Sequence, residues 1–357
     1  MPHQPNRTLG SIRQTRGSPS VDFVQEQADV CRLAAQEPTT YQFTFLGRQR
    51  HLIPFLGVKK GSVQTLMSKT FSLELVRDLL GCGAIDLERV SLYSEQTREG
   101  PYPVFRDEES GVIFLGNDYP GDAEYTSGRY WGHSALDPET EQRDLQRRTS
   151  SLEEHYLGKS ILDFGCGTGG FLRTVRNFAS LVAGVDLDEG LRESLVKDGF
   201  AAYSSVSECD VAFDTIFAFH SFHHVPTPAG LLHDIRSRLR PGGNVIIEVP
   251  SAHDPLLELY KLDCFRSFTL SRFHLVLHTV DSLRRLLKAN AFEPVSVSLV
   301  QRYPLSNHLS WLRDCTPSGF HSMFSVLDSE DVHSEYTRTL QGLGLSDTLI
   351  AVATALP

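Results

Sequence analysis

The stretch that decides the fold is Ile161-Leu162-Asp163-Phe164-Gly165-Cys166-Gly167-Thr168-Gly169-Gly170. An apolar run ends in an acid, glycines follow at alternate positions, and Phe171, Leu172 and Val175 then recur at helical spacing. Glycine has no β-carbon, so it takes sharp dihedral angles and lets a ligand approach the backbone. The start of the helix adds free N–H groups and the positive end of a dipole. This strand, loop and helix predict a site for a nucleotide-like cofactor.

Two kinds of cofactor fit the loop. Gly165, Gly167 and Gly170 satisfy the pattern G-x-G-x-x-G, which is typical of NAD and FAD sites. With Asp163 the loop also satisfies D-x-G-x-G-x-G, which favours S-adenosylmethionine (SAM). A carboxylate would repel an anionic pyrophosphate and attract the cationic ammonium of a methionine moiety, so SAM is favoured and an NAD(P)-dependent oxidoreductase is the alternative. The loop residues predicted to bind the cofactor are Asp163, Gly165, Cys166, Gly167 and Gly169, with Cys166 as a small spacer and not a nucleophile.

Further strand ends carry polar residues. Residues 181–185 form an apolar run that ends at Asp186-Leu187. An acid about 20 residues past the glycines can accept hydrogen bonds from ribose hydroxyls, so Asp186 and its neighbour Leu187 are predicted cofactor residues. Asp188 could share that task or cap the next helix. A strand at 213–219 leads directly into His220, which we expect beside the methionine part of SAM.

In these features the chain resembles the class I SAM-dependent methyltransferases. The matching pieces are the loop at 163–169, Asp186, Phe213-Asp214, the His223-His224-Val225 turn and the turn at 239–243. The resemblance covers residues of about 140 to 300 and a last strand near 348–355. It implies a Rossmann-like α/β fold with a mostly parallel seven-stranded sheet whose last strand is reversed. Segments 273–275, 301–308 and 344–349 are similar to a bacterial subgroup that acts on sugars and other small metabolites.

Composition narrows the classes of partner. The 357 residues carry a net charge of −10, which argues against nucleic acid because phosphate binding needs concentrated Lys and Arg. No apolar run is long enough to cross a membrane. The six cysteines are scattered without C-x-x-C spacing, which disfavours zinc and a disulfide framework and suits a reducing compartment. We therefore predict a cytoplasmic enzyme that uses no metal.

The chain divides into a tail at 1–19, a small α+β domain at 20–135 and a SAM-binding domain at 136–357. The middle part could cap the active site, present substrate or form a homodimer. Residues 301–346 are an insertion between the last two strands, either a substrate lid or a helical excursion. In the resembled family an aromatic segment at the place of residues 125–132 closes over the cofactor, which implies that role for Tyr125 and Tyr130.

The histidines suggest the chemistry. The methyl of SAM is already an electrophile, so the enzyme must align a nucleophile, exclude water and remove a proton near neutral pH. Histidine suits that last task. His223 is the first candidate for a general base. The resemblance implies His274 as the second candidate and a turn-stabilising role for His224. We predict transfer to an oxygen, less favourably a nitrogen or carbon, of a sugar, nucleotide sugar or natural-product intermediate. A non-catalytic SAM-binding protein is the third class.

Overall fold

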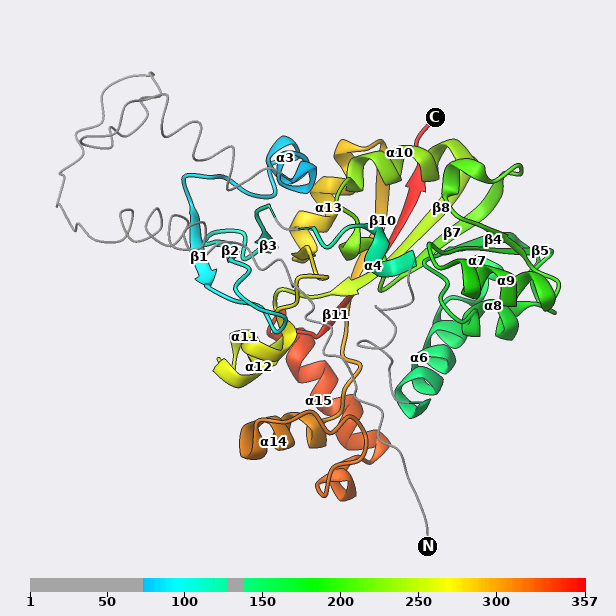
Figure 1. Cartoon of the computed structure of the whole chain (residues 1–357). Helices are drawn as coiled ribbons and strands as arrows, with labels where there is room; N and C mark the ends of the chain where they lie inside the picture. The colour runs from blue at the N-terminus through cyan, green and yellow to red at the C-terminus, as the bar shows by residue number, and fades with distance from the viewer. Residues whose placement is uncertain (1–72, 118, 127–137) are drawn as a thin grey trace, which may run out of the picture. The chain divides into compact units, whose positions relative to one another are not determined.

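The computed structural model describes residues 73–117, 119–126 and 138–357 (Figure 1). The described elements belong to one compact unit. The predicted tail at 1–19, a large part of the predicted α+β domain and Tyr130 lie outside the described residues. Among the residues that the structure covers, no helix is long and apolar enough to cross a membrane.

A seven-stranded sheet forms the centre, in the order β10-β11-β8-β7-β4-β5-β6. Its strands are β4 (Ser160–Phe164), β5 (Leu181–Val185), β6 (Ala201–Tyr203), β7 (Phe213–Phe219), β8 (Leu239–Pro250), β10 (Phe292–Val300) and β11 (Thr348–Ala355). The five strands from β8 to β6 pair in parallel, and β11 runs antiparallel to both β8 and β10. This confirms the predicted sheet. The chain order reverses between β4 and β7, and ligands of such sheets bind at the carboxyl ends of the strands at that point.

Helices cover both faces because both faces of the central strands are apolar. They are α6 (Pro138–Ser151), α7 (Glu153–Tyr156), α8 (Gly170–Val175), α9 (Glu189–Lys197), α10 (Pro228–Arg238) and α13 (Val280–Ala289). Leu162 and Ile216 pack with residues of α10 and α13, whereas Ile161 and Phe217 pack with residues of α8. Each such fully buried side chain contributes ~1.5–3 kcal/mol. The carboxyl ends of β4 and β7 are thereby held between two packed layers.

A smaller antiparallel sheet has the order β1-β2-β3-β9. It consists of β1 (Val90–Ser94), β2 (Val104–Asp107), β3 (Ile113–Leu115) and β9 (Val276–Leu277), preceded by α3 (Glu74–Gly81) and followed by α4 (Asp122–Thr126). The pairing of β2 with β3 confirms the hairpin that the sequence predicts. The fourth strand, β9, comes from far beyond residue 136, so the small sheet is built jointly by the segment before the SAM-binding domain and by that domain.

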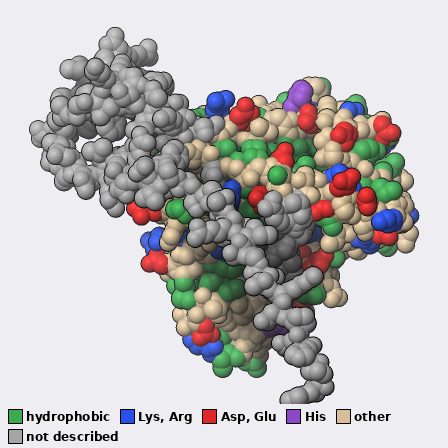
Figure 2. Space-filling view, viewed as in Figure 1, with side chains coloured by type: hydrophobic (Ala, Val, Ile, Leu, Met, Phe, Trp, Pro, Cys, Tyr) green, Lys and Arg blue, Asp and Glu red, His purple; other side chains and the backbone are tan. Residues whose placement is uncertain are grey.

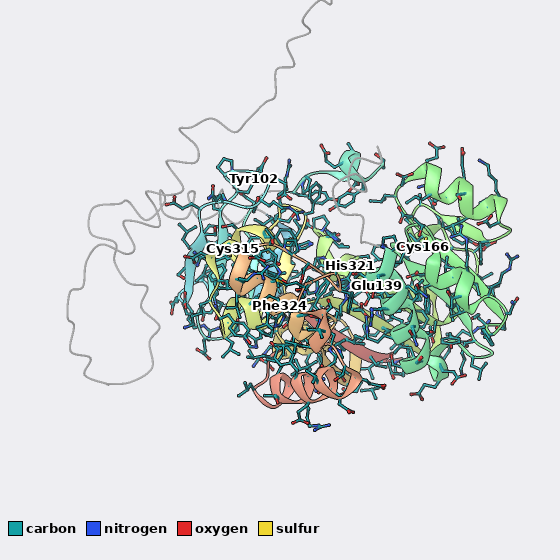
Figure 3. The ribbon with its side chains drawn as sticks, turned by 90° about the horizontal axis from the view of Figure 1, so that it is seen from below. Tyr102, Glu139, Cys166, Cys315, His321 and Phe324 are labelled. Carbon is teal, nitrogen blue, oxygen red and sulfur yellow. A yellow bond between two sulfur atoms is a disulfide. The ribbon has the colours of Figure 1, made fainter. Side chains whose placement is uncertain are left out.

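The remaining described elements lie after β8, apart from two short helices that precede it. They are α11 (Pro255–Glu258), α12 (Asp263–Thr269), α14 (Leu305–Asp314), α15 (Glu330–Gly342) and the short helices η1 (Val206–Glu208), η2 (Phe222–His224) and η3 (Ser325–Leu327). A disulfide joins Cys264 of α12 to Cys315 at the end of α14 (Figure 3). The expectation of no disulfide was therefore wrong for this pair. Packing of Phe265 against Trp311, with ring centroids 5.1 Å apart, brings the two helices together, and cysteine spacing carries no trace of that contact.

Candidate cofactor and acceptor site

The glycine loop turns tightly across the end of β5. The backbone N–H groups of Gly165 and Cys166 both donate to the carbonyl of Val185, at 2.8 and 3.0 Å. Gly165 has φ +71°, and a β-carbon there would lie 2.4 Å from the β-carbon of Ser221. Gly169 caps α8 at φ +78°, a conformation that favours glycine. The predicted loop residues thus form one turn at the carboxyl end of β4.

Cys166 fills the space behind this turn. It is buried, and its Sγ would lie 2.7 Å from a β-carbon built at Gly184 of β5. Burial raises the pKa of the Cys166 thiol, so the thiol stays protonated at neutral pH. These contacts suit the predicted spacer and give the residue no nucleophilic character.

Asp163 presents an unpaired acid at the end of β4. Only 4% of the residue is exposed, and its Oδ1 has no hydrogen-bond partner in the described structure. Burial raises the pKa of Asp163 to about 7, and the nearby guanidinium of Arg148 opposes the shift only in part. Buried polar atoms in proteins are nearly always hydrogen-bonded. An orphan carboxylate oxygen beside a bare backbone loop therefore fits the ammonium group of a methionine moiety.

Asp186 lies across the loop from Asp163. Its Oδ2 accepts a hydrogen bond from the backbone N–H of Gly167 and its Oδ1 accepts one from Asp188, both at 2.9 Å. A carboxylate offers about four lone-pair sites, so acceptor capacity remains for ribose hydroxyls. The Asp188 side chain accepts from the N–H of Leu191 and caps α9, which is the helix-cap role left open by the sequence. Leu187 is 39% exposed and offers apolar surface beside Asp186.

A buried cluster of charges flanks the other side of Asp163. Glu248 of β8 is fully buried and accepts hydrogen bonds from the Nη2 atoms of Arg147 and Arg148 on α6, at 2.9 and 2.6 Å. The Nε2 of His220 lies 3.0 Å from its Oε1. Burial opposes ionisation of Glu248, but the two guanidiniums and His220 hold its pKa well below the usual range. This cluster anchors α6 over the ends of β7 and β8.

The cluster extends into the insertion. Arg302 forms an ion pair with Asp144 of α6, and its backbone N–H donates to Oδ2 of Asp347 at 2.9 Å. Sequence reasoning missed the roles of Arg147, Arg148 and Arg302. The i, i+3 and i+4 spacing of Asp144, Arg147 and Arg148 marks one face of a helix, but the partner Glu248 lies about 100 residues away.

The insertion also touches α6 nearer its amino end. His321 Nε2 lies 3.5 Å from Glu139 Oε2, and the two side chains meet in Figure 3. The guanidinium of Arg143 lies 4.1 Å from the centroid of the Phe320 ring. Arg302, Phe320 and His321 of the insertion therefore contact the helix that precedes the glycine loop.

His220 is held in an unusual backbone conformation directly after β7. Its φ is +50°, and its N–H donates to the carbonyl of Glu248 at 2.8 Å. Strained backbone of this kind persists only where the surroundings fix it, and it clusters at functional sites. Burial lowers the pKa of His220 to about 4, because desolvation outweighs the attraction of Glu248. The ring is thus a neutral, fixed group at the switch point of the sheet.

Three further histidines gather beside His220. The ring centroids of His223 and His224 lie 4.1 Å apart, and those of His223 and His274 lie 4.8 Å apart. The Nδ1 atoms of His223 and His274 are buried and have no hydrogen-bond partner among the residues that the structure describes. Burial holds the pKa of His223 well below the usual range and lowers that of His274 to about 4. The two predicted base candidates therefore meet at one place as neutral imidazoles.

Tyr125 borders the histidine cluster. Its ring centroid lies 6.0 Å from that of His224 and 5.9 Å from that of Phe273. Tyr125 thus lies on the acceptor side of His220, and its predicted closure over the cofactor stays a prediction.

The segment before the SAM-binding domain holds the acceptor side in place. Glu99 accepts hydrogen bonds from Oγ of Ser271 and from the backbone N–H of Arg272, both at 2.9 Å. The backbone N–H of Leu275 donates to the carbonyl of His223 at 3.0 Å. These contacts fix the chain on both sides of His274 against η2 and the small sheet.

Comparison with known proteins agrees with this geometry. Residues 139–297 match a family described as a methyltransferase domain. A ubiquinone biosynthesis O-methyltransferase of Stutzerimonas stutzeri is 27% identical over 130 residues, which are 32% of this chain and 56% of that protein. A tRNA U34 carboxymethyltransferase of Alteromonas mediterranea is 24% identical over 214 residues, covering 55% and 61%. The chain thus spans little more than half the length of these curated relatives.

Among solved structures, the chain is similar to a magnesium protoporphyrin IX methyltransferase of Synechocystis with bound SAH, at 14% identity and a TM-score of 0.42. The similarity covers 66% of this chain and 97% of that chain. Of the two predicted cofactors, the match to a methyltransferase domain supports SAM and argues against NAD(P). The residues of the loop fit SAM, because Asp163 has an orphan oxygen and Gly165 has no room for a side chain. Residues 139–297 thus match the methyltransferase-domain family, in line with the resemblance to class I SAM-dependent methyltransferases that the sequence predicts.

Proposed function

We propose that the protein transfers a methyl group from SAM to an oxygen of a small polar acceptor. One observation carries this proposal: the orphan carboxylate oxygen of Asp163 and the neutral histidines after β7 lie at the carboxyl ends of adjacent strands. Bound SAM would supply an electrophilic methyl group. Nitrogen and carbon acceptors are less favoured. They have no hydroxyl proton to lose, so the histidines beside the donor site would have no task in their methylation.

Each side of the site has a separate task. Asp163 holds the ammonium, Asp186 the ribose hydroxyls, and Leu187 covers an apolar face of the ligand. Glu248 and the α6 arginines neutralise one another behind His220 and hold α6 at this end of the sheet. The acceptor enters beside His223 and His274, with Tyr125 at its border. The roles of all these residues in binding and catalysis are proposals.

The proposed acceptor class rests on the charge of the chain and on the lining of the site. A net charge of −10 and the mixed acidic and basic side chains on the visible face disfavour a polyanion (Figure 2). One relative is named for ubiquinone biosynthesis and another for a tRNA, so relatives do not choose between acceptors. A sugar, nucleotide sugar or natural-product intermediate suits a site lined by neutral imidazoles. A cytoplasmic location and a homodimer belong to the same proposal, as does a lid formed by 301–346.

The test is a screen with SAM labelled in its methyl group. Sugars, nucleotide sugars, phenols and a bulk tRNA preparation serve as acceptors, and each product is analysed for the atom that carries the label. We expect label in an O-methyl ether of a small molecule. Labelled tRNA with no labelled small molecule would contradict the proposal. Tight SAM binding with no labelled product, and His223→Ala without effect, would indicate the non-catalytic alternative.

A further inference from the structure

Three histidines form an arrangement that the proposed methyl transfer does not by itself require. One ring nitrogen from each of His223, His224 and His274 lies within 4.8 Å of the other two. We propose that these three imidazoles bind one divalent first-row transition metal ion, such as Zn²⁺, which leaves a coordination position open for the acceptor hydroxyl. The role at the acceptor rests on the proposed function, whereas binding of the ion does not. This proposal departs from the expectation that the protein uses no metal.

The distances suit such an ion. Zinc binds imidazole nitrogen at ~2.0–2.1 Å, so a tetrahedral ion places its nitrogen ligands ~3.4 Å apart. The three histidines need to close by no more than ~1.5 Å from their present positions, which small ring rotations supply. Two of them share η2, and the third is fixed to η2 through the hydrogen bond from Leu275 to His223. The cluster is therefore held together before any ion arrives.

The protonation states also suit a metal. The Nδ1 of His224 lies 2.6 Å from the carbonyl oxygen of Phe273. A carbonyl only accepts, so Nδ1 carries the hydrogen in this contact and an ion would bind through Nε2. The ring also forms a hydrogen bond with the backbone of His220, with which an ion would have to compete. A metal-bound histidine is commonly oriented by such a contact of its other nitrogen.

Unpartnered nitrogens supply the second observation. The Nδ1 atoms of His223 and His274 are buried and have no hydrogen-bond partner in the described residues. His223 is only 1% exposed. Leaving a buried polar atom unpaired costs ~1–3 kcal/mol, so two such atoms in one cluster need a compensating partner. A shared ion would satisfy both.

The number of ligands points to chemistry and not to a structural role. Structural zinc sites use four protein ligands, whereas catalytic sites use three and keep a position open. The cluster lies next to His220, whose ring centroid is 6.1 Å from that of His223, and therefore next to the cofactor side. An ion here would face an acceptor that approaches the methyl group.

The ion would act on the acceptor as a Lewis acid. A hydroxyl oxygen bound to the ion loses its proton to water more readily, because the cation stabilises the oxyanion. The oxyanion then forms the new O–C bond while the S–C bond of SAM breaks and its electron pair stays on sulfur. Nothing is oxidised or reduced.

The test uses the full chain after treatment with a chelator and gel filtration. Zn²⁺ is titrated by calorimetry, and Co²⁺ by its visible ligand-field absorption, into wild type, His274→Ala and the exposed-site control His321→Ala. We expect one ion per chain, a tetrahedral Co²⁺ spectrum, and affinity lower by ~100-fold or more in His274→Ala only. SAM is titrated into each protein as well, and its affinity should be the same in all three.

The outcomes separate this proposal from the proposed function. Wild type that binds SAM but neither Zn²⁺ nor Co²⁺ would overturn the metal site and leave methyl transfer standing. Equal ion affinity in wild type and His274→Ala would also overturn it. Stoichiometric ion binding without SAM binding would instead refute the proposed function. Methyl transfer that is as fast after chelation as after Zn²⁺ addition would overturn the role of the ion at the acceptor.

Discussion

Replacing Asp163 with Asn should stabilise the protein without ligand, and the gain should grow with pH. The pKa of Asp163 is raised from 3.8 to about 7 in the folded state. At a pH between these two values the carboxyl is protonated in the folded protein and ionised in the unfolded protein. Stability then falls as pH rises, because the unfolded state binds fewer protons. Asn carries no charge at any pH and escapes this penalty.

The magnitude follows from the pKa shift. One pKa unit corresponds to ~1.4 kcal/mol, so the ionised Asp163 costs ~4 kcal/mol once the pH exceeds its folded-state pKa. A buried amide brings its own unpaired polar atoms, at ~1–3 kcal/mol. The net gain for Asp163→Asn is therefore ~1–3 kcal/mol at about pH 8 and smaller or absent at about pH 5.

Urea unfolding of wild type and Asp163→Asn at both pH values measures this gain. Asp188→Asn is the matched control, since Asp188 caps α9 and Asn caps a helix equally well. We expect the control to follow wild type at both pH values. A gain in Asp163→Asn that is equal at both pH values, or a loss at the higher one, would refute an unpaired buried acid at the end of β4.

Three further variants test the frame around the site. Gly165→Ala places a β-carbon 2.4 Å from that of Ser221. It should lower the free energy of unfolding by ~1–3 kcal/mol and weaken SAM binding. An unchanged thermal unfolding midpoint and an unchanged SAM affinity by calorimetry would contradict this. Glu248→Gln removes the charge that the half-buried guanidiniums of Arg147 and Arg148 share, although Arg147 keeps Asp144 at 3.0 Å. It should destabilise the protein by ~1–3 kcal/mol, and an unchanged free energy of urea unfolding would show that the cluster is solvated. Cys264→Ser removes the disulfide to Cys315, 51 residues away, and should lower the free energy of unfolding by ~2–4 kcal/mol relative to the oxidised wild type. Equal unfolding midpoints of the wild type with and without reductant would contradict the disulfide.

The sheet and the cofactor loop could be predicted because their signals are local. Asp163, Gly165 and Asp186 lie at strand ends that apolar runs mark in the sequence, and connections in such folds follow few rules. The reversed last strand followed from the family resemblance and is confirmed in β11. Each of these features needs only neighbouring residues or a known order of elements.

The parts that sequence did not predict are made by contacts between distant residues. Glu248 meets Arg147 across 101 positions, and Cys264 meets Cys315 because two helices pack. Strand β9 pairs with β3 although more than 150 residues separate them. The sequence predicted His223 and His274 as alternative bases. That both lie close to His224 depends on the packing of η2 against the segment around Ser271, which hydrogen-bonds to Glu99.

Calorimetric titration of SAM into wild type and Asp163→Asn at neutral pH, with NAD as the competing ligand, tests the central claim most directly. The orphan carboxylate predicts that wild type binds SAM and not NAD, and that Asp163→Asn binds SAM more weakly by ~1–3 kcal/mol. Equal SAM affinity in the two proteins, or binding of NAD in place of SAM, would contradict the assignment of this loop.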